Sequence, residues 1–96
     1  MSIQWNNKLI LKKADIDVVD YVFDWTNTLA TGEEITASTF IVETGLIKDS
    51  DSNTILTATI WLSGGTLGKT YTVTNTIVTN SSRTISRSIK IKIEKL

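Results

Sequence analysis

Apolar and polar residues alternate along much of the chain, and this period of two is typical of β-strands with one buried face. The pattern is clearest near the C-terminus, where Ile89, Ile91 and Ile93 share one face and Ser and Lys residues share the other. No long stretch has the apolar spacing of an amphipathic helix. Thirty-five of the 96 residues are Ile, Val or Thr, whose branched side chains pack better on a pleated sheet than in a helix. The pattern predicts an all-β protein.

Six segments that lie between turn signals are predicted to form strands. They are Lys8–Lys13, Asp17–Trp25, Thr36–Glu43, Thr54–Leu62, Thr70–Thr79 and Thr84–Glu94. In the third segment the alternation leaves open which side chains face the core, either Thr39 and Ile41 with Ala37 or Phe40 with Val42. Six or seven short strands in a chain of this length predict a two-sheet β-sandwich of about seven strands.

The connections between these strands contain residues that favour turns. Asn27–Thr31 is predicted to form one helical turn, which Gly32 ends in the left-handed conformation. Asp49–Asn53 is a run of Asp, Ser and Asn that predicts a polar turn, and Asn80–Ser82 predicts a hairpin turn. Glu33 and Glu34 are interpreted as solvated loop residues.

Ten large apolar or aromatic side chains are expected to supply most of the core between the two sheets. They are Tyr21, Phe23, Trp25, Leu56, Ile60, Tyr71, Val73, Ile77, Ile89 and Ile91. Asn75 lies on the same inner face and needs a hydrogen-bond partner, because an unpaired buried amide costs about 1–3 kcal/mol.

The length and composition predict one small domain at residues 8–96, preceded by an N-terminal arm at residues 1–7. The arm is too polar for the apolar segment of a signal peptide, and no apolar run is long enough to span a bilayer. We therefore expect a protein that is made in the cytosol and has no membrane partner. The absence of Cys suits that reducing compartment.

Enzymatic chemistry finds little support in the residues. The chain has no His and no Cys, which removes the commonest general base and any thiolate nucleophile or metal ligand. A Ser–Lys nucleophile needs no His, but no motif positions such a pair. Gly68-Lys69-Thr70 resembles the end of a phosphate-binding loop, yet a strand rather than a helix follows it. We predict no catalytic residue and no cofactor.

Two acidic groups are candidate metal sites. Asp49-x-Asp51-x-Asn53 begins like a calcium loop, but Thr54 and Ile60 occupy the places where that loop requires Gly and Glu. Asp15, Asp17, Asp20 and Asp24 form a looser group. A calcium site between loops is one reading of this second group, and a solvated acidic surface is the reading that we predict. No metal site is therefore expected.

Charge is balanced overall but divided along the chain. The ten Lys and Arg residues equal the Asp and Glu residues in number, and nine of the ten acidic residues lie between residues 14 and 51. Residues 69–96 contain six basic residues and one Glu. Aromatic residues that could stack on bases do not interleave with the basic strand, so nucleic-acid binding is not predicted. An acidic region and a basic region instead favour contact between proteins, including contact between copies.

Four residues are candidates for binding a protein partner, namely Trp5, Trp61, Lys90 and Lys92. Trp5 lies in the polar arm, where it either anchors a partner or folds back over one end of the sandwich. Trp61 lies in an alternating strand and is either a packing residue or part of an exposed aromatic patch. Lys90 and Lys92 are expected to keep an edge strand from pairing with another chain.

The segment Thr66–Val73 resembles the tyrosine corner of immunoglobulin-like and fibronectin type III sandwiches, in which a Gly precedes a Tyr at the start of the penultimate strand. This resemblance assigns Tyr71 a structural role and implies an immunoglobulin-like β-sandwich. Leu67 stands where these folds usually have Pro. The absence of a Cys pair excludes a disulfide-bonded antibody-type domain. Trp25 is likewise interpreted as structural.

Most of the chain after the arm also resembles small structural proteins encoded by tailed bacteriophages and prophages. The resemblance rests on Asp20–Trp25 (DYVFDW), Ile35–Thr39 (ITAST), Ile60–Thr66 (IWLSGGT), Tyr71–Asn75 (YTVTN) and Arg87–Ile91 (RSIKI). It implies a virion structural protein, which we expect to be a head or neck decoration or an assembly factor. The alternative is a module of the virion that binds the host surface or a carbohydrate.

The expected partners are capsid, neck or tail proteins, with a homo-oligomer also open. The expected location is the virion, after assembly in the host cytoplasm.

Overall fold

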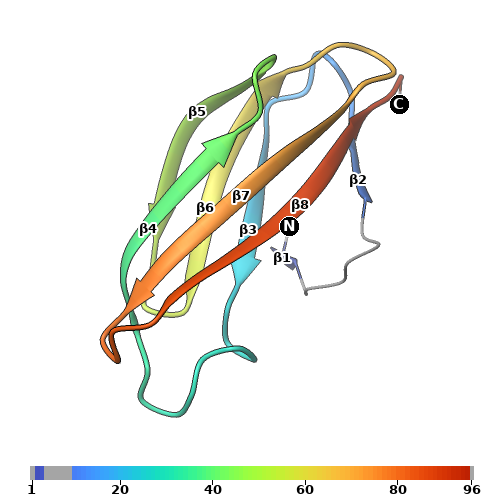
Figure 1. Cartoon of the computed structure of the whole chain (residues 1–96). Helices are drawn as coiled ribbons and strands as arrows, with labels where there is room; N and C mark the ends of the chain where they lie inside the picture. The colour runs from blue at the N-terminus through green and yellow to red at the C-terminus, as the bar shows by residue number, and fades with distance from the viewer. Residues whose placement is uncertain (1, 4–9, 96) are drawn as a thin grey trace.

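A computed structural model of the chain describes residues 2–3 and 10–95. These residues form eight strands and no helix, in two packed sheets (Figure 1). The strands are β1 (Ser2–Ile3), β2 (Ile10–Lys13), β3 (Val19–Asp24), β4 (Ile35–Val42), β5 (Leu46–Asn53), β6 (Thr57–Gly64), β7 (Thr70–Thr79) and β8 (Thr84–Ile93). Without the two-residue β1, seven strands remain. The predicted all-β sandwich of about seven strands is confirmed.

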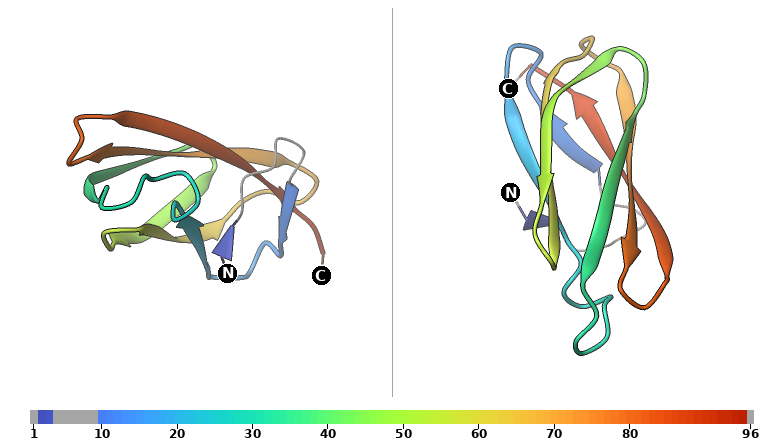
Figure 2. Two further views of the ribbon diagram at one scale, coloured as in Figure 1. Left: turned by 90° about the horizontal axis from the view of Figure 1, so that it is seen from below. Right: turned by 90° about the vertical axis from the view of Figure 1, so that its left-hand side faces the viewer.

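The two sheets have four strands each. Their orders are β1-β3-β6-β5 and β2-β8-β7-β4, and Figure 2 shows them as two layers. All neighbours are antiparallel except two pairs near the N-terminus, β1 with β3 and β2 with β8. The orders β3-β6-β5 and β4-β7-β8 are those of strands B, E, D and C, F, G in a constant-type immunoglobulin sandwich.

The core lies between the inner faces of the two sheets. Nine of the ten predicted core side chains are buried, and Leu56 is partly buried against them. The face of β4 that the sequence left open is now clear, because Phe40 is buried and Ile41 is 65% exposed. Phe40 meets Phe23 from the opposite sheet edge to face, with ring centroids 5.4 Å apart. The core also includes Ala58, Leu62 and Ile93. Each lies two residues from a predicted core residue, Ile60 or Ile91, and therefore on the same face of its strand.

Asn75 is the polar centre of this core, and its predicted need for partners is met. Its side-chain oxygen accepts a hydrogen bond from the indole Nε1 of Trp25 at 2.9 Å. Its amide nitrogen donates to the hydroxyl of Ser38 at 3.0 Å and to the carbonyl of Thr39 at 3.1 Å. This network joins β4 and β7 to the residue that follows β3, so it connects the two sheets. Trp25 is fully buried, as its structural role requires.

Tyr71 forms the hydrogen bond that a tyrosine corner requires. Its buried hydroxyl accepts from the backbone N–H of Thr66, five residues upstream, at 3.0 Å. The ring also explains Gly45, which has a φ of +108°. A Cβ atom at residue 45 would lie 2.8 Å from the Tyr71 ring, so only glycine fits beside the ring without a shift.

The polar run Asp49–Asn53 is not a turn, and that prediction was wrong. It is the exposed second half of β5, which lies at the edge of its sheet and pairs with β6. An edge strand with solvent around it needs backbone hydrogen bonds more than apolar side chains, so alternation does not reveal it. The turn lies later, where the Thr54 hydroxyl accepts from the N–H of Thr57 at 3.0 Å, and β6 therefore starts at Thr57.

Candidate protein-interaction surfaces

Trp61 lies on the outer face of the first sheet, where 42% of its surface is exposed. Its strand neighbours are Ile60 and Leu62, which are fully buried, so alternation turns the indole toward solvent. Beside it in the sheet, Asp20 of β3 and Ser50 of β5 are its register partners. The exposed indole is therefore surrounded by outer-face residues of three strands.

Two exposed aliphatic residues lie one row away from Trp61. Ile47 pairs with Ser63 on one side, and Val18 immediately precedes β3 on the other side. Ile47 is 55% exposed and Val18 is 59% exposed. Diagonal neighbours on a sheet are within reach of a large aromatic side chain. We call these residues, Val18, Asp20, Ile47, Ser50, Trp61 and Ser63, the Trp61 face.

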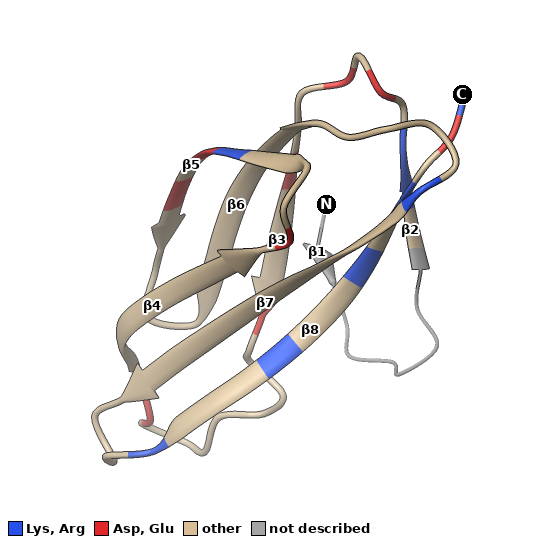
Figure 3. Ribbon diagram, turned by 45° about the horizontal axis from the view of Figure 1, so that its top comes forward, with Lys and Arg blue, Asp and Glu red and all other residues tan. Residues whose placement is uncertain are grey.

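The strands around the Trp61 face are acidic. Four Asp residues and one Lys are the charged residues of the described strands β3, β5 and β6, and Figure 3 shows the acidic positions on β3 and β5. Lys48 pairs with Asp51 at 2.7 Å on the edge strand. A partner that buries Trp61 would therefore meet carboxylates around it.

Lys90 and Lys92 lie on the other sheet, on the outer face of β8. Ile89, Ile91 and Ile93 between and beside them are buried, so alternation turns both lysines outward. Figure 3 shows β8 and β2 as the basic strands of the sandwich. The structure thus brings Lys90 and Lys92 together but places Trp61 on the opposite side of the molecule.

The strands of the second sheet are basic, but the carboxylate of Glu94 neutralises part of their charge. The ammonium groups of Lys12 and Lys92 lie 3.5 Å and 3.4 Å from the carboxylate of Glu94. Burial raises the pKa of Glu94, while Lys92 and Lys12 lower it more, so the net pKa is below the usual value. Among the ion pairs of the described residues none involves Lys90, which is exposed.

The two lysines do not protect a sheet edge as expected. β2 pairs with β8 in parallel over Lys90–Ile93, so this half of β8 lies inside the sheet. The sequence did not reveal β2 as the partner because a four-residue strand has too few alternations. Lys90 and Lys92 therefore keep the interpretation of a solvated face that is available for contact.

Lys13 of β2 is buried, although the sequence identified it only as the last residue of a predicted strand. Its ammonium group donates to the carbonyls of Ala14 at 2.7 Å and Gly64 at 2.8 Å, and so connects β2 to the end of β6 in the other sheet. Burial lowers the pKa of Lys13, and Asp17, Asp15 and Asp49 oppose that change. Its role is structural.

Glu33 corrects a further prediction, because it is 4% exposed rather than a solvated loop residue. Its carboxylate accepts from the Thr79 hydroxyl at 2.7 Å and from the N–H of Ala30 at 3.0 Å, and lies 3.3 Å from Nε of Arg83. These bonds, led by that of Thr79, hold the pKa of Glu33 below its usual value. Glu34 remains exposed. No local pattern separates the two residues, because two of the three partners of Glu33, Thr79 and Arg83, lie 46 or more positions away.

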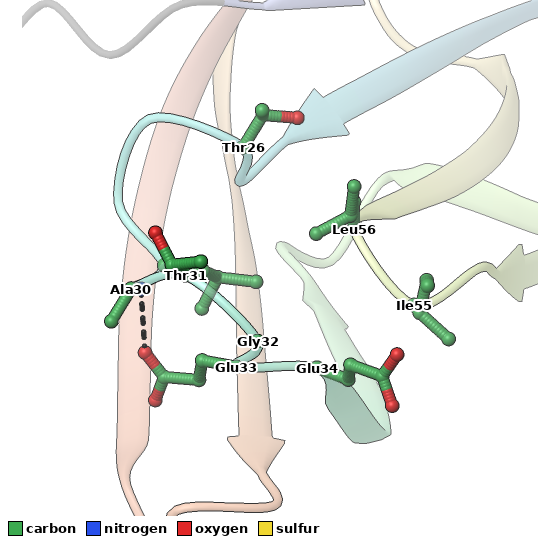
Figure 4. Close-up of a pocket in the computed structure, with 9 residues that line it drawn as sticks. Thr26, Ala30, Thr31, Gly32, Glu33, Glu34, Ile55 and Leu56 are labelled. Carbon is green, nitrogen blue, oxygen red and sulfur yellow. Dashed lines mark hydrogen bonds between the residues drawn. The ribbon is translucent and has the colours of Figure 1, made fainter.

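The loop that Glu33 holds encloses a hollow at the same end of the sandwich. The hollow has a volume of about 370 Å³ and lies between the β3–β4 loop and the β5–β6 turn (Figure 4). It is lined by Thr26, Leu29, Ala30, Thr31, Gly32, Glu33, Glu34, Ile55 and Leu56. The sequence did not indicate it, because it forms only where two distant connections meet.

Trp5 falls outside the described residues, as does most of the predicted arm. Across residues 2–3 and 10–95 the structure has no group of three Asp or Glu side chains placed to hold a metal ion. In the same residues no helix has the length and apolar character needed to cross a bilayer.

Comparison with known families gives one match. Residues 13–92 match the family described as podophage GP4 fiber-tail adaptor protein gp77. No curated protein sequence matches the chain. The matched residues run from the last position of β2 to the penultimate residue of β8, and so include both outer faces and the hollow.

Proposed function

This chain belongs to the podophage GP4 fiber-tail adaptor family, and from that premise we propose that it connects a tail fiber to the tail of a bacteriophage. Membership makes it a structural component of a phage virion. The head or neck decoration expected from the sequence stays a prediction, and the family supports the tail instead. The adaptor role requires one small protein to hold two partners at once without catalysis.

The observation that supports this role is the difference between the two outer faces. The Trp61 face combines exposed apolar side chains with carboxylates, whereas the opposite face presents Lys90 and Lys92 among Thr and Ser residues. Two packed sheets, about 10 Å apart, separate the faces. Partners of different chemistry can therefore bind on opposite sides without competing.

Each face indicates the chemistry of its partner. Trp residues dominate the binding energy of many interfaces because they fill apolar pockets and exclude water. A partner of the Trp61 face should therefore offer an apolar recess with basic residues near Asp20. A partner of the Lys90 face should present carboxylates, and the charges should mainly affect association rate and specificity.

The residues of the predicted arm, including Trp5, are proposed to add a third contact. Deletion of residues 1–7 should then abolish incorporation into virions while the sandwich stays folded. Unchanged incorporation with an unchanged circular dichroism spectrum would contradict this contact.

The partial exposure of Trp61 also favours a second candidate, a carbohydrate-binding or host-surface module. In that case the isolated protein should bind glycans, and Trp61→Ala should abolish this binding. The aliphatic neighbours Val18 and Ile47 favour a protein partner, whereas the polar register partners Asp20 and Ser50 beside the ring favour a sugar.

The test is to produce phage with face variants and count adaptor and fiber copies per virion by mass spectrometry and electron microscopy. Trp61→Ala and the double variant Lys90→Glu with Lys92→Glu should each lower fiber occupancy. One of the two variants should keep the adaptor on the tail without its fiber, whereas the other should release the adaptor from the tail. Asn53→Ala, at an exposed position at the end of β5 that belongs to neither group, is the control.

Full fiber occupancy in both variants would contradict the two-face adaptor. Tens to hundreds of copies located on the head would instead support the decoration role.

A further inference from the structure

The hollow at the end of the sandwich has apolar walls. Leu29 and Leu56 line it from the loop and the turn, and Ile55 stands at its mouth with 52% of its surface exposed. Figure 4 shows Leu56 reaching toward the loop from the opposite side of the hollow, with Ile55 next to it on the turn. Its volume of about 370 Å³ lies within the range of ligand pockets, about 300–1,000 Å³. The aliphatic part of a bound side chain would displace water from these walls, and the burial of its apolar surface would favour binding.

The charge at the rim is negative. In the described part of the chain, no hydrogen bond or ion pair involves the carboxylate of Glu34, and Figure 4 shows this carboxylate on the side of Ile55. Thr26, which also lines the hollow, donates its hydroxyl to the Asp24 carboxylate at 2.6 Å. The nearby cation, Arg83, is already paired with Glu33. The site therefore lacks a positive charge of its own.

The loop that forms the hollow is held in place before any ligand arrives. Asn80 donates its backbone N–H to the carbonyl of Glu34 at 2.9 Å and accepts from the N–H of Glu34 at 3.0 Å. Its amide group also donates to the carbonyl of Gly32 at 3.3 Å. With the buried Glu33, these bonds tie the loop to the β7–β8 turn. A loop fixed in this way loses little entropy on binding.

We propose that this hollow binds a basic side chain, Lys or Arg, presented by a segment of a partner protein. Both side chains combine an aliphatic stem with a charged head, so the stem would pack between Leu29, Ile55 and Leu56 while the head pairs with Glu34. The site lies at the end of the sandwich, away from the two outer faces, and its assignment does not depend on the adaptor role.

The test uses the isolated full chain and small probes, so that it is separate from any virion assay. Acetyl-arginine amide, acetyl-lysine amide and the neutral acetyl-norleucine amide are titrated into ¹⁵N-labelled protein, and backbone amide shifts are followed. We expect saturable shifts at Thr31, Gly32 and Ile55 in the millimolar range for at least one cationic probe. The norleucine probe should bind about threefold to fivefold more weakly.

Glu34→Gln should weaken binding of the cationic probe by the same factor, because it removes the carboxylate that pairs with the head group. The side chain is exposed, so the substitution should leave the fold intact. Glu43→Gln, an exposed carboxylate at the other end of β4, is the matched control and should change nothing. Ile55→Ala should weaken every probe.

The relative affinities of the arginine and lysine probes identify which head group fits better, and either preference supports the site. Shifts that do not saturate or that map elsewhere would overturn the proposal. Equal binding of norleucine, or no effect of Glu34→Gln, would also overturn it.

Discussion

Trp25 and Trp61 place the same side chain in opposite environments. Trp25 is fully buried between the sheets and donates its indole N–H to Asn75, whereas Trp61 is 42% exposed on an outer face. The difference comes from which side of a strand each residue occupies, and a shift by one residue would reverse it. The interior around Trp25 should therefore determine stability, and the outer face around Trp61 should determine binding.

The largest effect is expected for Trp25→Ala, which removes a fully buried indole and leaves Asn75 without one of its partners. Truncation of a buried Trp typically lowers the free energy of unfolding by about 3–5 kcal/mol. Urea denaturation followed by circular dichroism measures the loss. A loss below 1 kcal/mol would show that Trp25 does not organise the interior.

A smaller loss is expected for Asn75→Ala, because it removes the Oδ1 that accepts from the buried Nε1 of Trp25. An unsatisfied buried polar group costs about 1–3 kcal/mol. Asn53→Ala, on the exposed edge strand β5, is the matched control and should stay within about 0.5 kcal/mol of the wild type. Equal losses in the two variants would contradict the role of the network.

Tyr71→Phe removes the hydroxyl that accepts from Thr66 but keeps the ring against Gly45. The expected loss is about 0.5–1.5 kcal/mol, the net value of one hydrogen bond. Urea denaturation again provides the measurement. No change would mean that the ring contact alone holds the corner.

Glu33→Gln should change the response to acid. The pKa of Glu33 is lower in the folded protein than in the unfolded chain, so its ionisation stabilises the fold above about pH 4.5. That stability is lost as the pH falls through the lower, folded pKa. Urea midpoints measured between pH 7 and pH 3 should therefore fall less in Glu33→Gln than in the wild type. The exposed Glu34→Gln variant should follow the wild type, and identical curves for all three proteins would refute the assignment.

The smallest change in stability is expected for Trp61→Ala. An exposed side chain outside the core usually affects the free energy of unfolding by no more than about 0.5 kcal/mol. The same variant should nevertheless lower fiber occupancy in assembled virions, so binding and stability separate at this residue. A loss of stability comparable to that of Trp25→Ala would abolish the contrast.

Side-chain alternation was sufficient to predict much of the fold. β7 begins and ends where predicted, and the strands around Tyr21, Phe23 and Val73 turn these side chains inward as expected. Alternation works there because each strand has one buried face. The resemblance of Thr66–Val73 to a tyrosine corner implied a structural role for Tyr71, and the Tyr71 hydroxyl accepts from the N–H of Thr66, five residues upstream.

Alternation failed where a strand has no buried face or where a polar group finds a distant partner. β5 is exposed over most of its length, and its polar residues were predicted to form a turn. Glu33 and Lys13 are buried with partners far along the chain: the Thr79 hydroxyl donates to Glu33, and the Gly64 carbonyl accepts from Lys13. Of the candidate surface residues, the sequence named Trp61, Lys90 and Lys92 but not their arrangement on opposite sheets.

The order of residues alone determined that the chain forms strands and which side chains within most strands face inward, because the period of two is a local property of the backbone. Only the packing of the two sheets decided that Trp61 and Lys90 lie on opposite faces and that Glu33 is buried. It also decided that a hollow with a free carboxylate forms between two loops. Such features depend on residues that meet in space although they are distant in the chain, and no local pattern encodes that proximity.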